Sequence, residues 1–174
     1  MNSTELTLKV LDAQSGCKKS FAYICENYYK PSFRFAMKLS KHPDLAKDIT
    51  QEAWTTVAKD IKSLKEPSVF KAWLFRIIYR RFIDTQRKHK LQSLEDSAVP
   101  EPYQEEENEE LDISRYINQL PENERYTLYL FYFEQMSLSE IAVVSNVAVG
   151  TVKSRLFRAR AQLSIWLNED EVRK

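Results

Sequence analysis

The sequence predicts an all-α fold: two small helical domains joined by an acidic, flexible linker, the second domain carrying a helix-turn-helix. Only two of the 174 residues are glycine, while 43% are apolar and 29% are charged, a composition typical of a folded, helix-rich protein. Apolar residues recur with helical spacing in several segments, and two of these meet at a tight connection around Asn146. The third observation is a sharp change of charge along the chain.

Charge divides the chain into three segments. Residues 1–89 carry 17 basic and 9 acidic side chains, a net charge of +8, whereas residues 90–112 carry 1 and 9, a net charge of −8. Residues 113–174 carry 8 and 7, a net charge of +1. The middle segment has too few apolar residues to form a core. We therefore expect a first domain at residues 1–90, a linker at residues 91–112 and a second domain at residues 113–174.

The helix predicted at residues 44–61 has one apolar and one mainly acidic face. The residues predicted to point inward are Leu45, Ile49, Ala53, Val57 and Ile61. Those predicted to point outward are Asp44, Asp48, Gln51, Glu52 and Thr55. Because the first domain is otherwise basic, this outer face suits a protein partner better than DNA. The alternative is a solvated surface without a partner.

The helix predicted at residues 70–88 is apolar around most of its circumference but carries an arginine stripe. The stripe consists of Arg76, Arg80 and Arg87. Arginines interleaved with aromatic side chains suit a nucleic-acid surface that binds phosphates and stacks on unpaired bases. The residues expected in the core are Phe70, Trp73, Leu74 and Ile77. Arg81 falls on the apolar side and needs an acidic partner, either Asp84 or a residue of a neighbouring helix.

A helix-turn-helix is predicted at residues 137–163. Ser137 and Glu140 have the spacing of a capping box, and Asn146 stands where a left-handed residue would end the first helix. From Gly150 an apolar stripe resumes with Val152, Leu156, Ala159 and Leu163. The residues on or beside the opposite face are Thr151, Lys153, Ser154, Arg155, Arg158 and Arg160.

This second helix is suited to the major groove of DNA. Its hydroxyls and guanidinium groups could reach base edges while the flanking cations bind phosphates. The alternative is a solvated surface helix. That alternative is disfavoured because the four cations between Lys153 and Arg160 have no acidic residue in the same span, whereas solvated faces usually mix both signs.

Three stretches of the chain, in their order and spacing, point to a known family. They are DLAKDITQEAW at residues 44–54, FKAWLFRIIYRRFIDTQR at residues 70–87, and LPENERYTLYLFYFEQMSLSEIAVVSNVAVGTVKSRLFRARAQL at residues 120–163. Together they resemble the extracytoplasmic-function group of the sigma-70 family of bacterial transcription initiation factors. The resemblance puts region 2 of that family at about residues 21–90 and region 4 at about residues 113–167.

The resemblance implies roles for residues of the first domain. In the family, the acidic helix binds the clamp helices of the largest polymerase subunit, which here implies Asp48, Gln51 and Glu52. The loop at residues 63–69 matches the segment that captures a base flipped from the −10 element. The residues implied for −10 DNA are Leu64, Lys65, Arg76, Arg80 and Arg87. Because extruding a base costs a few kcal/mol, a pocket and phosphate contacts would have to offset it.

The resemblance also implies the roles of the second domain and the partners. The residues matched to reading of the −35 element are Thr151, Lys153, Ser154, Arg155 and Arg158. The acidic linker matches a segment that passes near the polymerase active site. The expected partners are core RNA polymerase, promoter DNA and an anti-sigma factor, with no cofactor or metal. The chain is not expected to be an enzyme, because RNA synthesis belongs to the polymerase.

Other function classes are less consistent with the sequence. A stand-alone helix-turn-helix repressor or activator, with an N-terminal dimerisation or sensor domain, would bind a palindromic operator without polymerase. A nucleic-acid enzyme is disfavoured because no carboxylates or histidines cluster at metal-ligand spacing. Cys17 and Cys25 are the only cysteines and are expected to be buried thiols. Without an apolar run of about 18 residues or a leader peptide, we expect a cytoplasmic protein with no membrane insertion.

Overall fold

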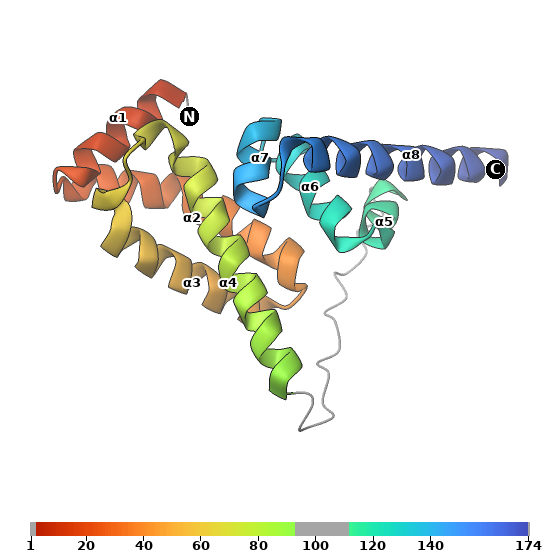
Figure 1. The fold of residues 1–174 in the computed structure, drawn as a ribbon, viewed down its shortest axis with the longest axis horizontal. Coiled ribbons are helices and arrows are strands. Elements are labelled where there is room, and N and C mark those ends of the chain that lie inside the picture. Colours follow the sequence, from red (N-terminus) through yellow and green to blue (C-terminus); the bar gives the residue numbers. More distant parts are fainter. Residues whose placement is uncertain (1–2, 93–111, 174) are drawn as a thin grey trace. The chain divides into compact units, whose positions relative to one another are not determined.

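The computed structural model describes residues 3–92 and 112–173, and all regular structure in these ranges is helical (Figure 1). The helices form two compact units, α1–α4 and α5–α8, each described separately below. The predicted all-α fold with two helical domains is therefore confirmed. The acidic linker predicted at residues 91–112 lies outside the described residues except at its ends, where α4 includes Leu91 and Gln92 and α5 begins at Asp112.

The described residues of the first unit, 3–92, form four α-helices and two short 3-10 helices. They are α1 (Ser3–Gln14), α2 (Lys18–Ser40), α3 (Pro43–Asp60), η1 (Ile61–Ser63), η2 (Pro67–Val69) and α4 (Phe70–Gln92). Lys41 ends α2 in the left-handed conformation, with φ of 55°, and its N–H donates to the Met37 carbonyl at 2.8 Å. Pro43 then begins α3. The N–H of the first helical residue has no acceptor within the helix, so proline, which lacks an N–H, costs no hydrogen bond there. The α2–α3 connection is consequently tight.

Helices α2, α3 and α4 pack against one another around the core of this unit. The largest fully buried side chains there include Ile24, Phe35, Val57, Phe70, Leu74, Phe75, Ile78 and Phe82. The rings of Phe35 and Phe75 lie 5.2 Å apart between centroids. Trp73 and Ile77, which were expected in the core, are only half-buried. Because α4 packs against both α2 and α3, its inward face is centred on Phe75, Ile78 and Phe82 instead.

The two cysteines do not both lie in the interior. Cys17 is exposed at the N-cap of α2, whereas Cys25 is half-buried within that helix, and neither forms a disulfide. The prediction of buried thiols is therefore wrong for Cys17. The physical reason is its position before the first turn, directly after Gly16, whose φ of 94° turns the chain out of α1.

The second unit contains the predicted helix-turn-helix. Its helices are α5 (Asp112–Gln119), α6 (Glu122–Tyr132), α7 (Leu138–Ser145) and α8 (Val149–Arg173). The capping box is present: the Ser137 N–H donates to Glu140 Oε2 at 2.8 Å, and the Glu140 N–H donates to Ser137 Oγ at 3.2 Å. Asn146 ends α7 with φ of 54° and ψ of 49°, the left-handed conformation that the sequence predicts.

Helix α8 has the predicted two faces. Its buried stripe consists of Val152, Leu156, Ala159 and Leu163. Helix α6 runs through the interior of the unit, because each residue from Glu124 to Leu130 is buried. It packs against α8 and provides a fixed support for that helix. None of the described helices is both long and apolar enough to cross a membrane.

Candidate functional site

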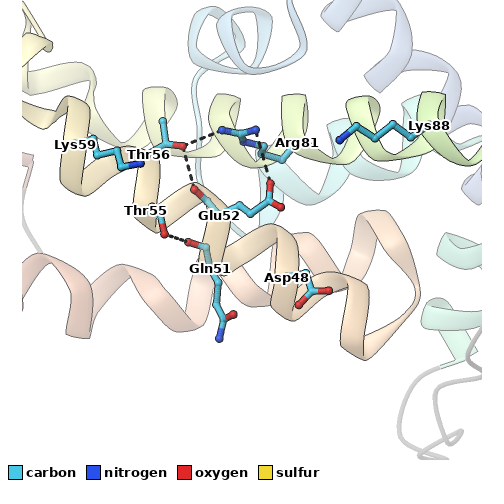
Figure 2. Close-up of a pocket in the computed structure, with 8 residues that line it drawn as sticks. All are labelled: Asp48, Gln51, Glu52, Thr55, Thr56, Lys59, Arg81 and Lys88. Atoms are coloured by element: carbon cyan, nitrogen blue, oxygen red, sulfur yellow. Dashed lines mark hydrogen bonds and ion pairs between the residues drawn. The ribbon is translucent and has the colours of Figure 1, made fainter.

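The outward face of α3 is polar and exposed to solvent. Asp48, Gln51 and Glu52 are exposed, while Ile49, Ala53 and Val57 on the opposite side are buried. An open depression of about 640 Å³ lies along this face and is also lined by side chains of α4 (Figure 2). Its lining residues are Asp48, Gln51, Glu52, Thr55, Thr56, Lys59, Arg81 and Lys88. The three residues predicted to bind the polymerase are thus brought together on one surface.

Arg81 of α4 connects the two helices across this depression. Its Nη2 donates to Thr56 Oγ1 at 3.1 Å, and its Nη1 lies 3.7 Å from Glu52 Oε2 (Figure 2). This confirms the prediction that Arg81 takes an acidic partner, which comes from the neighbouring helix rather than from Asp84. Asp48 lies apart from this cluster and makes no ion pair with any described residue. Of the two carboxylates predicted to bind the polymerase, Glu52 is therefore paired with a cation, whereas Asp48 has no ion pair with a described residue.

The loop between α3 and α4 is fastened to α1 by a residue that sequence reasoning missed. Gln14 Nε2 donates to the Ile61 carbonyl at 2.8 Å and to the Leu64 carbonyl at 2.7 Å. Within this loop Leu64 is half-buried and Lys65 is exposed. The contact spans 47 and 50 residues of sequence, and no local pattern around Gln14 signals it.

The predicted arginine stripe on α4 is accessible. Arg80 and Arg87 are exposed and Arg76 is half-buried. None of the three has an ion pair with a described carboxylate. Arg81 lies about 100° further around the helix than Arg80, given 3.6 residues per turn. Helix α4 therefore contributes one arginine to the acidic face of α3 and presents three others in a different direction.

The residues predicted to read DNA from α8 differ in their surroundings. Thr151, Lys153, Ser154 and Arg158 are exposed, but Arg155 is half-buried. Arg155 Nη1 is shielded from solvent and has no hydrogen-bond partner among the described residues. Arg160, which flanks them, donates from Nε to Tyr132 Oη at 2.9 Å. Its guanidinium carbon lies 5.4 Å and 5.5 Å from the centroids of the Phe131 and Tyr132 rings, distances typical of cation–π contacts.

Arg158 is also partnered. Its Nε donates to Glu124 Oε1 at 2.7 Å, from α8 to the first turn of α6. The span from Lys153 to Arg160 contains four cations and no acidic residue, and the Glu124 carboxylate lies 34 residues before Arg158 in the chain. The contact was not predictable from local spacing, because it depends on how α6 and α8 pack.

Comparisons with known proteins identify both units. Residues 24–92 match Sigma-70 region 2 and residues 110–163 match Sigma-70, region 4. The chain is 32% identical over 154 residues to the ECF RNA polymerase sigma factor SigM of Bacillus subtilis (strain 168), covering 83% of this chain and 93% of SigM. It is 33% identical over 147 residues to the ECF RNA polymerase sigma factor EcfG of Rhodopseudomonas palustris (strain TIE-1), covering 80% of this chain and 81% of EcfG.

A solved structure agrees with these relatives. The sigma factor RpoE from Bartonella quintana, in complex with the anti-sigma factor NepR, superposes with a TM-score of 0.72 at 26% identity. The match covers 86% of this chain and 98% of that one. Both sigma regions, the full-length relatives and the fold agree: the chain belongs to the extracytoplasmic-function (ECF) group of the sigma-70 family and is an RNA polymerase sigma factor.

Proposed function

We propose that this sigma factor binds core RNA polymerase through the exposed face of α3. The candidate contacts are Asp48, Gln51 and Glu52, held outward by the buried stripe on the other side of the helix. The bonds from Arg81 to Glu52 and Thr56 connect α3 to α4, so the partner would meet a preformed surface. Asp48 supplies an exposed carboxylate that makes no ion pair with a described residue.

The observation that carries this proposal is the separation of charge around α4. Arg81 belongs to the acidic face of α3, whereas Arg76, Arg80 and Arg87 point elsewhere and have no acidic partner among the described residues. A protein partner and DNA could therefore be bound by the first unit at the same time.

At the −10 element, we propose that Leu64 and Lys65 receive a flipped base while the arginine stripe binds phosphates. Gln14 supports this assignment, because its two hydrogen bonds hold the backbone that carries Leu64. A preformed loop lowers the ordering cost of binding, and phosphate contacts offset a base-flipping cost of a few kcal/mol. No hydrolysis is needed for this step.

At the −35 element, we propose that α8 enters the major groove as the recognition helix. The candidate contacts are Thr151, Lys153, Ser154, Arg155 and Arg158. Exposed hydroxyls and guanidinium groups on one face of a helix fit direct reading of base edges, and Lys153 fits a phosphate contact. Residues 1–90 and 113–174 would then act as region 2 and region 4, with residues 91–112 as the linker between them.

The remaining assignments follow from the family. We propose that the chain acts in the cytoplasm and performs no catalysis, since the polymerase synthesises the RNA. RpoE of Bartonella quintana is bound by the anti-sigma factor NepR, and we propose that an anti-sigma factor likewise restrains this chain. A stand-alone helix-turn-helix regulator is not favoured, because region 2 is present as well as region 4.

The direct test combines binding and transcription. The purified full chain should co-elute with bacterial core RNA polymerase and should yield run-off transcripts from a subset of genomic promoter fragments, each sharing two sequence elements. Absence of co-elution, together with binding of a palindromic duplex by the chain alone, would instead indicate the stand-alone regulator.

A further inference from the structure

We infer that Glu124 is a positioning residue that orients Arg158 for reading a base edge, an inference that rests on the proposed contact between Arg158 and the −35 element. Glu124 lies in the first turn of α6 and Arg158 on the exposed side of α8. Both belong to the second unit, so the contact does not depend on how the two units are arranged.

The contact has the geometry of a charge-assisted hydrogen bond. Arg158 Nε and Glu124 Oε1 are 2.7 Å apart, at the short end of the range for such bonds. The Glu124 side chain is only 12% exposed, whereas that of Arg158 is 58% exposed. A carboxylate removed from water needs a partner, and Arg158 is the cation that the described residues provide. Glu124 is consequently the fixed member of the pair.

The backbone around Glu124 is equally constrained. Its N–H donates to the Pro121 carbonyl at 2.9 Å, and α6 is buried without interruption from Glu124 to Leu130. Arg158, by contrast, projects from the exposed side of α8. The carboxylate therefore fixes the direction of a side chain that would otherwise sample many rotamers in water.

The bond uses only one part of the guanidinium group. With Nε bound to Glu124, the terminal nitrogens Nη1 and Nη2 remain available, and these two donors can bind a single base edge in a bidentate manner. Because the rotamer is already restricted before DNA arrives, less conformational entropy is lost on binding. The expected consequence is stronger discrimination between bases at the position that Arg158 contacts.

Charge alone predicts a different effect from orientation. A carboxylate near DNA repels phosphates, so its removal would strengthen binding to every sequence alike. If Glu124 orients Arg158, moving the carboxylate away from the guanidinium group without removing its charge should reduce base discrimination at the single position that Arg158 contacts. Glu124→Asp shortens the side chain by one methylene and retains the charge, whereas Glu124→Gln retains the length and a hydrogen-bond acceptor but removes the charge.

The experiment uses holoenzyme assembled from the full chain and bacterial core polymerase. Promoter fragments with a randomised upstream element are bound, and the bound fraction is sequenced to give the base preference at each position. The variants are Glu124→Asp, Glu124→Gln, Arg158→Ala and the double variant Glu124→Asp/Arg158→Ala. Glu122→Gln is the matched control, because Glu122 is an exposed carboxylate in the same turn of α6. Thermal melting of each variant reports whether it is folded.

Arg158→Ala should abolish the base preference at one position of the upstream element. Glu124→Asp should reduce the preference at that same position roughly tenfold, and this reduction should be larger than the one that Glu124→Gln causes. Glu124→Asp should have no further effect in the Arg158→Ala background, and Glu122→Gln should change no base preference. If Glu124→Asp lowers the melting temperature, Glu124→Met is compared with Glu124→Gln instead, because both lack the charge and only Gln keeps an oxygen that can accept from Arg158; Glu124→Met should then lose more discrimination.

Two other results would overturn the inference. If Glu124→Asp keeps the preference that Arg158→Ala loses, Glu124 does not position Arg158, although Arg158 still reads DNA. Uniformly altered binding at every position would indicate charge or general stability instead of orientation. A preference that survives in Arg158→Ala itself would refute the proposed role of Arg158, and this outcome is distinguishable from the first two.

Discussion

Replacing Asp48 by Arg tests the acidic face of α3 with little expected change in the stability of the fold. Asp48 is exposed and has no ion pair with any described residue, so the substitution breaks no ion pair among them. Surface substitutions of this kind usually change the free energy of unfolding by less than about 0.5 kcal/mol. Arg is also a slightly better helix former than Asp, by a few tenths of a kcal/mol. The variant should therefore fold normally.

The effect on polymerase binding should be much larger. A close charge pair at a protein interface contributes about 1.5 kcal/mol or more. Reversal of the charge at Asp48 removes one such attraction and adds a repulsion of similar size, about 3 kcal/mol in total. Since each 1.4 kcal/mol is a factor of ten in affinity, the dissociation constant for core polymerase should rise roughly 100-fold.

The assay is a titration of labelled full chain with core polymerase at low and at physiological salt. Glu26→Arg is the matched control, because Glu26 is an exposed carboxylate on α2 and its reversal changes net charge equally. The control should bind like the original chain, and the Asp48→Arg defect should shrink as salt screens the charges. Binding by Asp48→Arg within twofold of the original chain would refute the assignment of this face. An equal loss in both variants would attribute the effect to net charge.

Three further perturbations test local features of the fold. Asn146→Val should lower the unfolding free energy of the second unit by about 1–2 kcal/mol, because a β-branched residue must adopt φ of 54°, whereas Asn146→Gly should not; denaturant unfolding compares them. Gln14→Leu should remove the side-chain donor from the Leu64 carbonyl, while the Ile61 carbonyl still accepts from the Leu64 N–H; amide hydrogen exchange at Leu64 should accelerate, and exchange in α8 should stay unchanged. Hydrogen bonding with Ser20 lowers the pKa of the exposed Cys17 thiol, whereas burial raises the pKa of the Cys25 thiol. At pH 7.5 a larger fraction of Cys17 than of Cys25 is therefore thiolate, the form that reacts. Iodoacetamide should alkylate Cys17 first, which mass spectrometry of the modified chain measures.

Features encoded locally were predictable from the sequence. The capping box at Ser137 and Glu140 depends on residues three apart, and the left-handed end at Asn146 depends on one residue type. The buried stripe of α8 follows from helical periodicity alone. These signals place the ends and faces of helices, because the physics that determines them acts within one or two turns.

The pairing of side chains across the fold was not predictable in the same way. Periodicity indicated that Arg81 faces the interior and needs an acidic partner, but the choice of Glu52 depends on how α3 packs on α4. No sequence pattern near Gln14 signals its contacts, because the two carbonyls that it binds, those of Ile61 and Leu64, lie in the segment between α3 and α4. For the same reason, the core face of α4 was predicted only in part: Phe70 and Leu74 are buried as expected, but packing against α2 and α3 buries Phe75, Ile78 and Phe82 in place of Trp73 and Ile77.

The cations of α8 show how side-chain pairing that local sequence does not reveal bears on the proposed function. On a helical projection, Lys153 and Arg160 flank the outer face of α8 on one side, Arg155 flanks it on the other, and Arg158 lies between them, so the projection gives all four the same standing as surface cations. In the fold, Arg158 is bonded to a carboxylate, Arg160 lies against two rings, and Arg155 is half-buried. Lys153 alone among these four is exposed without a described partner, which suits a mobile phosphate contact. A fixed arginine suits discrimination between bases, because only a side chain held in one direction can prefer one hydrogen-bonding pattern over another. In the proposed recognition helix, the neighbours of each cation would therefore assign affinity to Lys153 and base discrimination to Arg158.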